Sequence, residues 1–207
     1  LILRELSSAK EDTIRDAKAH LFNKFGNAFA VTIEPDKKDS TAVPHLVLYD
    51  LEAGTRETIS NGMKEYRSLA FDEPGEQLLF LATNDTSKIE QKRFALRYYQ
   101  NGRDSALVLA DESAKGLPEG WIFNENASPS FSKNGERILV GAAPRREPKD
   151  TTIVDFEMAR LDIWHWQDPL VQPQQLVEQG REERRTYTGI VLPHQPQRFQ
   201  PIATEAM

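Results

Sequence analysis

Residues 128–141 read SPSFSKNGERILVG and hold the complete pattern of a β-hairpin. Phe131 leads in, Asn134-Gly135 supplies a tight turn, and the apolar run 138–140 leads out. Asn and Gly both tolerate the positive φ angles that short hairpin turns require. The stretch therefore predicts two antiparallel strands that meet at Gly135.

The same pattern occurs earlier in the chain. Residues 68–83 read SLAFDEPGEQLLFLAT, with Phe71 before the turn Pro74-Gly75 and an apolar run after it. A weaker copy places Phe25-Gly26 before the apolar residues 29–33. Repeats of short strands, spaced by roughly 40 to 60 residues, are typical of propeller blades.

Three further hairpins are predicted, in residues 45–60, 94–110 and 186–203. In the first two, Gly54 and Asn101-Gly102 supply the turns. The run 45–50 is apolar on both faces, as expected of a strand packed between two neighbouring sheets.

The N-terminal residues 1–26 allow two interpretations. Ile14, Ala17, Leu21 and Phe22 have the spacing of an amphipathic helix, whereas the repeat predicts strands. We favour the strands.

The passage 161–176, LDIWHWQDPLVQPQQL, predicts a strand that stops at Asp168-Pro169 and resumes over 172–176. Trp164 and Trp166 would share one face of this strand and fill the wedge between two blades, as Trp121 would elsewhere, although a binding platform is the alternative. Arg145 and Arg146 are expected in a solvated loop.

These patterns predict an all-β chain, a partial β-propeller of about four blades built from four-stranded antiparallel sheets. Residues 1–207 would form one incomplete propeller domain. The approximate blades are 1–60, 61–112 and 113–180, with 181–207 beginning a further blade.

Composition excludes several classes of function. With 26 basic and 32 acidic residues the formal charge is −6, so nucleic acid is not expected as a partner. The absence of cysteine excludes disulfides and thiolate chemistry. No apolar run reaches the roughly 18 residues of a membrane span. The first residues are not a signal peptide, and a start at Leu1 without Met suggests a piece of a longer protein.

The repeats at 68–83 and 128–141 resemble those of TolB-like proteins and of the N-terminal propellers of the prolyl oligopeptidase family of serine peptidases. The passage 161–176 resembles large exported Bacteroidetes-type members, which are dipeptidyl or acylaminoacyl peptidases. The resemblance implies a propeller that caps a C-terminal α/β-hydrolase domain with a Ser-Asp-His triad. It also implies a periplasmic or secreted location.

This sequence departs from that family in lacking the nucleophile motif G-x-S-x-G. We therefore expect a non-catalytic segment, inactive alone, that gates the access of peptides to a hydrolase domain outside this chain. The alternative is a TolB-like propeller that binds a protein partner with no hydrolase attached. A self-standing hydrolase using paired carboxylates is the third hypothesis, but the acids are scattered.

The candidate substrate-binding residues are Glu182 and Glu183. In dipeptidyl peptidases of the resembled family, paired glutamates of the propeller hold the α-amine of the substrate, as two carboxylates grip a cation. The competing interpretation is a solvated charged turn, because Arg181, Arg184 and Arg185 surround the pair.

No catalytic residue, metal site or cofactor is predicted. The histidines (His20, His45, His165 and His194) lack the spacing of metal ligands. The expected partners are the hydrolase domain and peptide substrates. An incomplete propeller also exposes strand edges, so the isolated chain is expected to self-associate.

Overall fold

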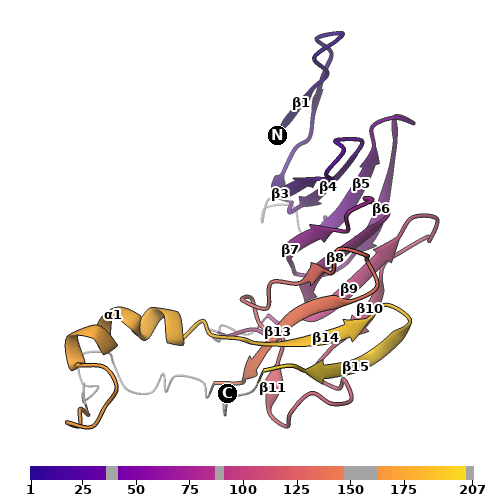
Figure 1. Ribbon diagram of the computed structural model, residues 1–207. Helices are drawn as coiled ribbons and strands as arrows, with labels where there is room; N and C mark the ends of the chain where they lie inside the picture. Colours follow the sequence, from indigo (N-terminus) through magenta and orange to yellow (C-terminus); the bar gives the residue numbers. More distant parts are fainter. Residues whose placement is uncertain (36–41, 87–90, 147–162, 204–207) are drawn as a thin grey trace.

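The computed structural model describes residues 1–35, 42–86, 91–146 and 163–203. Their strands form four antiparallel sheets, which follow one another along an arc in chain order (Figure 1). The predicted all-β architecture is therefore confirmed, and strands replace the alternative helix at the N-terminus.

The first sheet is a two-stranded N-terminal ribbon, β1 (Ile2–Arg4) and β2 (Glu11–Thr13). The first blade contains β3 (Ala17–Phe22), β4 (Ala28–Ile33), β5 (His45–Asp50) and β6 (Thr55–Asn61) in spatial order. The second blade contains β7 (Glu65–Phe71), β8 (Gln77–Thr83), β9 (Ala95–Gln100) and β10 (Leu107–Ala110).

The third blade is built around β13 (Ile138–Pro144). Two short strands, β11 (Trp121–Ile122) and β12 (Ser130–Phe131), pair with successive parts of its inner edge, and β14 (Tyr187–Leu192) and β15 (Gln195–Pro201) follow on the other side. The C-terminal hairpin thus completes this sheet, since Leu139 pairs with Ile190. This differs from the expectation that residue 181 begins a further blade.

Core clusters fill the spaces between neighbouring sheets. Leu46, Ile59, Leu78 and Phe80 pack between the first and second blades, each nearly or fully inaccessible. Leu96, Leu109, Val140 and Phe199 do the same between the second and third. A smaller cluster of Ile14, Phe29, Val31 and Val47 joins the ribbon to the first blade. Both faces of the central strands are buried, as the apolar runs predict.

The passage with two tryptophans was predicted wrongly. Residues 163–166 form no strand, and 161–162 lie outside the described residues. Trp164 and Trp166 remain 55% and 76% exposed and fill no wedge between blades. By contrast, Trp121 packs as predicted against the core between the second and third blades, with its ring centroid 5.0 Å from that of Tyr187.

The predicted strand over 172–176 is instead the start of the helix α1 (Gln172–Glu182), which lies away from the sheets (Figure 1). Pro173 fits the first turn, where its missing N–H is not needed, and the following Gln, Leu and Glu favour helix. No residue of α1 is buried. Local pairs support it, including Gln175 Nε2 donating to the carbonyl of Leu170 at 2.9 Å.

Candidate functional site

The inner hairpin of every blade closes with the same turn. In each, Asn23, Asp72 or Ser132 lies three residues before a glycine and accepts a hydrogen bond from its amide. The side-chain oxygen of the same residue caps amides that follow the glycine: Asn23 Oδ1 accepts from Ala28 N at 3.1 Å, Asp72 Oδ1 from Gln77 N at 2.9 Å, and Ser132 Oγ from Arg137 N at 3.0 Å. We call these three the turn caps and Gly26, Gly75 and Gly135 the turn glycines.

Successive turns stack on one another. Gly75, at φ +81°, lies so close to the first blade that a Cβ there would be 2.3 Å from Asn23 Nδ2. A Cβ at Gly135 would be 2.8 Å from Gln77 Nε2, which itself donates to Asp72 Oδ2 at 2.8 Å. Gly75 and Gly135 are thus each seated on the cap region of the preceding blade, which fixes the order in which the inner strands of the three blades follow one another.

This stacking brings one aromatic residue from each inner strand together. Phe22, Phe71 and Phe131 each directly precede a turn cap, and they line one pocket of about 390 Å³. Lys24 and Glu73 form an ion pair between successive turns at its border. The inner strands thus end in a pocket that contains three aromatic rings and has a charged border.

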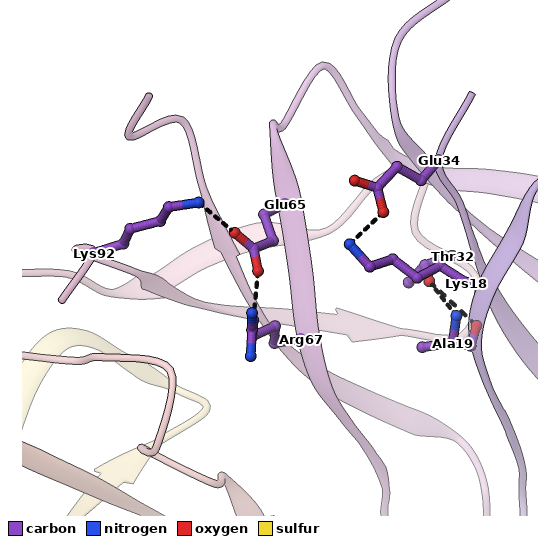
Figure 2. A network of polar contacts seen from close by, with 7 residues as sticks. All are labelled: Lys18, Ala19, Thr32, Glu34, Glu65, Arg67 and Lys92. Atoms are coloured by element: carbon purple, nitrogen blue, oxygen red, sulfur yellow. Dashed lines mark hydrogen bonds and ion pairs between the residues drawn. The ribbon is translucent and has the colours of Figure 1, made fainter. Parts of the chain in front are cut away.

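The other end of the inner strands is charged. Glu65 accepts from Arg67 Nε at 2.5 Å and from Lys92 Nζ at 2.8 Å (Figure 2). Burial acts to raise the pKa of Glu65, but the hydrogen bonds from Lys92 and Arg67 outweigh it and hold the pKa below its usual value. Lys18, on the neighbouring inner strand β3, pairs with Glu34 (Figure 2). We call these five residues the charged rim.

The rim and the aromatic pocket lie at opposite ends of the innermost strands, which face the central channel in a closed propeller. Lys18 and Arg67 are equivalent in the repeat, because each lies four residues before its inner-strand phenylalanine. Paired charges at such a rim can exchange their partner for the charged end of a peptide.

Two clefts open between neighbouring blades at the end that carries the turns. The cleft of about 510 Å³ between the first and second blades is lined by Tyr99 and by more acidic than basic side chains, namely Asp50, Glu52, Glu57 and Glu76 against Arg56. Burial, and then the hydrogen bond to Glu57, raise the pKa of Tyr99 above its usual range. The cleft of about 580 Å³ between the second and third blades carries Arg103, Arg137 and His194, with Glu136 as its acidic side chain. The two clefts therefore differ in charge.

Glu182 and Glu183, the predicted substrate residues, lie at the end of α1 and are exposed. Glu182 accepts from Arg185 at 2.5 Å and Glu183 from Gln179 at 2.9 Å. They belong to a helix end rather than to the expected turn. Arg145 and Arg146 are exposed, as expected of a solvated loop.

The structure adds residues that sequence reasoning missed, namely the turn caps and the charged rim. The caps had a readable signal: Asn, Asp or Ser three residues before the glycine of each repeat. The rim had none, because Lys92 reaches Glu65 from a distant segment.

Within the described ranges no three His, Asp or Glu side chains converge as a metal site would require. Among the same residues, no helix has the length and apolar character needed to cross a bilayer.

No protein-family model matches the chain, and no curated protein matches it. Solved structures do. The β-propeller domain of the Trilobed protease from Pyrococcus furiosus, which has an open velcro topology, aligns with 98% of this chain and 48% of its own, at 13% identity and a TM-score of 0.53.

Two other alignments have lower TM-scores. TolB from Acinetobacter baumannii aligns with 98% of this chain and 37% of its own, at 12% identity and a TM-score of 0.46. A puromycin-hydrolyzing peptidase from Mycobacterium tuberculosis aligns with 97% of this chain and 24% of its own, at 9% identity and a TM-score of 0.49. This chain spans about half of the Pyrococcus propeller domain and less of the other two proteins. Its sheets, turns and cores are those of part of a β-propeller.

Proposed function

We propose that this chain is the non-catalytic propeller part of a serine peptidase of the prolyl oligopeptidase family, and that it gates the access of peptides to an α/β-hydrolase domain. The observation that carries the proposal is the alignment of 98% of the chain with the propeller domain of a protease. The location proposed for this peptidase is the periplasm or the cell exterior, which fractionation of the source cells would test.

The innermost strands give gating a physical basis. A flexible peptide can present one charged end at a time to the charged rim, where Arg67 and Lys18 offer cations held only by exchangeable ion pairs. A folded protein would be too large to pass between the inner strands, whose turns approach one another closely at Gly75 and Gly135. Selection would therefore act on size first and on charge second.

The first test asks whether chemistry resides in this chain. The purified 207-residue chain should not cleave aminoacyl-proline chromogenic substrates, whereas a longer polypeptide that continues past Met207 should. Turnover that stays with the short chain through purification would refute the non-catalytic role. A stop codon directly after Met207 would favour the alternative, a TolB-like protein-binding module.

The second test concerns gating by the rim. In the longer peptidase, Arg67→Ala should lower kcat/KM for a peptide of several residues by about tenfold, because the rim loses a cation that binds the peptide. The kcat/KM for a two-residue substrate should fall less. Arg145→Ala, which alters an exposed loop arginine, is the matched control. Equal effects of both variants on both substrates would contradict gating at the rim.

The roles of Glu182 and Glu183 remain part of the proposal. If they hold the substrate amine, Glu182→Gln with Glu183→Gln should raise KM for substrates with a free amino terminus and leave N-acylated substrates unchanged. An equal KM for the two substrate types would remove them from the site.

Self-association through an open blade face also follows from this reading. Leu139 and Ile190 are half-buried on the outer face of the third blade, and Ile202 is 48% exposed nearby. Light scattering of the isolated chain at high micromolar concentration should show oligomers, and a monomer would count against it.

A further inference from the structure

The N-terminal ribbon repeats the outer hairpin of the first blade. Residues 1–14 read LILRELSSAKEDTI and residues 46–59 read LVLYDLEAGTRETI. The pairing registers coincide when the two are aligned: Ile2 faces Thr13 as Val47 faces Thr58, and Arg4 faces Glu11 as Tyr49 faces Arg56.

The turns of the two hairpins agree as well. Ala9 adopts φ +56° where Gly54 adopts φ +66°, an uncommon conformation for a residue with a side chain. Glu5, which corresponds to Asp50, accepts hydrogen bonds from Ser7 and Ser8, as Asp50 accepts from the amides of Glu52 and Ala53. The ribbon is thus the outer half of a blade.

The ribbon also occupies the place of an outer half-blade. Ile14 packs against Phe29 and Val31 of β4. In the next interface Ile59 packs against Leu78 and Phe80 of β8, which hold the corresponding positions of the repeat. The ribbon therefore meets the first blade as the first blade meets the second.

The inner half of this blade has no counterpart among the described residues. The N-terminal ammonium of Leu1 donates to the carbonyl of Ile14, and the amide of Glu5 donates to the carbonyl of Lys10. Residues 1, 3 and 5 therefore direct their N–H groups toward β2. By the alternation of an antiparallel strand, the amides of Ile2 and Arg4 point to the other edge, where no described strand pairs. Leu1 and Ile2 are 42% and 61% exposed, whereas their equivalents Leu46 and Val47 are 0% and 8% exposed.

A second observation concerns the turn glycines. Gly75 and Gly135 each lie against a cap region of the preceding blade, but a Cβ at Gly26 would have no atom within 4 Å. No described residue therefore occupies the position next to Gly26 that the turn cap of a preceding blade would fill. The N-terminal ribbon, which has no inner hairpin among the described residues, belongs to that preceding blade.

From both observations we infer that the free edge of β1 is a docking site for a β-hairpin of the inner type, contributed by another part of the same propeller. Its second strand pairs antiparallel with β1 at Ile2 and Arg4, and its turn carries an Asn, Asp or Ser cap that seats on Gly26. The partial alignment supports this source, because the matched propeller domain is about twice as long as this chain. A second copy of the chain fits less well, since its own inner hairpins are already paired.

The test supplies the missing hairpin. A copy of residues 16–44, which contains β3, β4 and the following loop, is placed before Leu1 of the full 207-residue chain. Tethering makes the docking intramolecular, so a short edge suffices. The amide exchange of Ile2 and Arg4 should slow by about tenfold or more, because they gain strand partners. The control carries Ala30→Pro in the copied hairpin only, which a central strand does not tolerate.

A second readout is Gly26→Ala. In the original chain this substitution costs only the strain of a positive φ. In the extended chain, the same substitution at the original Gly26, not in the copied hairpin, should also reverse part of the slowing of amide exchange at Ile2 and Arg4. Unchanged exchange in the extended chain would overturn the inference. So would protection of Ile2 and Arg4 in the original chain that grows with concentration, since a second copy would then hold the edge. Either failure leaves the proposed peptidase role standing, because the inference concerns only the propeller fold.

Discussion

The blades and the segment 163–186 place their large apolar side chains in opposite ways. Phe80 in β8 is fully buried, while Trp166 in the segment is 76% exposed. Strand β8 pairs on both sides and packs between two other sheets, whereas α1 has no buried residue and is held by side-chain pairs within a few residues. Apolar character in a sequence thus becomes burial only where neighbouring elements supply a surface.

The same contrast separates global stability from local order. A change in a blade core acts on two sheets at once, so its cost spreads through the stack. A change in the helical segment acts on local pairs alone. The following substitutions measure this difference.

The largest effect is expected for Phe80→Ala, which empties the core between the first and second blades. Removal of a fully buried Phe costs about 3 to 5 kcal/mol of unfolding free energy. Urea unfolding followed by tryptophan fluorescence measures it. Phe80→Leu, which retains most of the volume, should cost less than half as much, and equal costs would show that the site is not close-packed.

The next effect concerns the stacked turns. Gly75→Ala places a Cβ at φ +81° and 2.3 Å from Asn23 Nδ2, an atom held by its own hydrogen bond to Asn27. Gly102→Ala has a similar φ of +86° with nothing within 4 Å. Both substitutions carry about 1 kcal/mol of left-handed strain, and Gly75→Ala should cost about 1 to 3 kcal/mol more. Equal unfolding free energies for the two variants would contradict the seating of one turn on the next.

The blade hairpins could be predicted because their signals are local. The dipeptides Asn101-Gly102 and Asn134-Gly135 indicate tight hairpin turns, and alternating or continuous apolar runs flank them. The strand predicted for residues 45–50 is confirmed, and it could be predicted for the same reason. A turn and two flanking strands lie within one short window, so no distant contact had to be guessed.

The prediction of strands in residues 161–176 was wrong because it depended on the apolar composition of the passage, which is typical of a strand, and not on a periodic pattern. Pro173, followed by the helix-favouring residues Gln174, Gln175 and Leu176, indicates the start of a helix, but the prediction gave more weight to the tryptophans. The charged rim could not be predicted from the sequence for another reason, because the contact of Lys92 with Glu65 depends on how two separate segments fold together. Site residues that come from separate segments need the structure.

A third prediction follows from the lowered pKa of Glu65. A carboxyl whose pKa is depressed on folding stabilises the protein above its unfolded pKa of about 4.3, and this contribution disappears as pH falls through the folded value. Glu65→Gln should therefore cost about 1 to 2 kcal/mol at pH 7, and the difference from wild type should shrink toward pH 3.

Glu112→Gln is the matched control for the rim. Glu112 pairs with Arg93, but the two side chains are 52% and 43% exposed. Its loss should change the unfolding free energy by less than about 1 kcal/mol at any pH. A pH-independent cost for Glu65→Gln, parallel to that of the control, would show that the rim carboxyl is not stabilised as an anion.

The smallest effect is expected for Trp166→Ala, although tryptophan is the largest side chain in the molecule. The ring touches His165 with a centroid separation of 5.7 Å and contributes to none of the three core clusters. Its loss should shift the unfolding free energy by no more than about 0.5 kcal/mol, as for other exposed positions. Urea unfolding followed by circular dichroism is the measurement, because the substitution removes a fluorophore. A cost near that of Phe80→Ala would mean that the tryptophan is buried in solution, and the contrast between the blades and this segment would then fail.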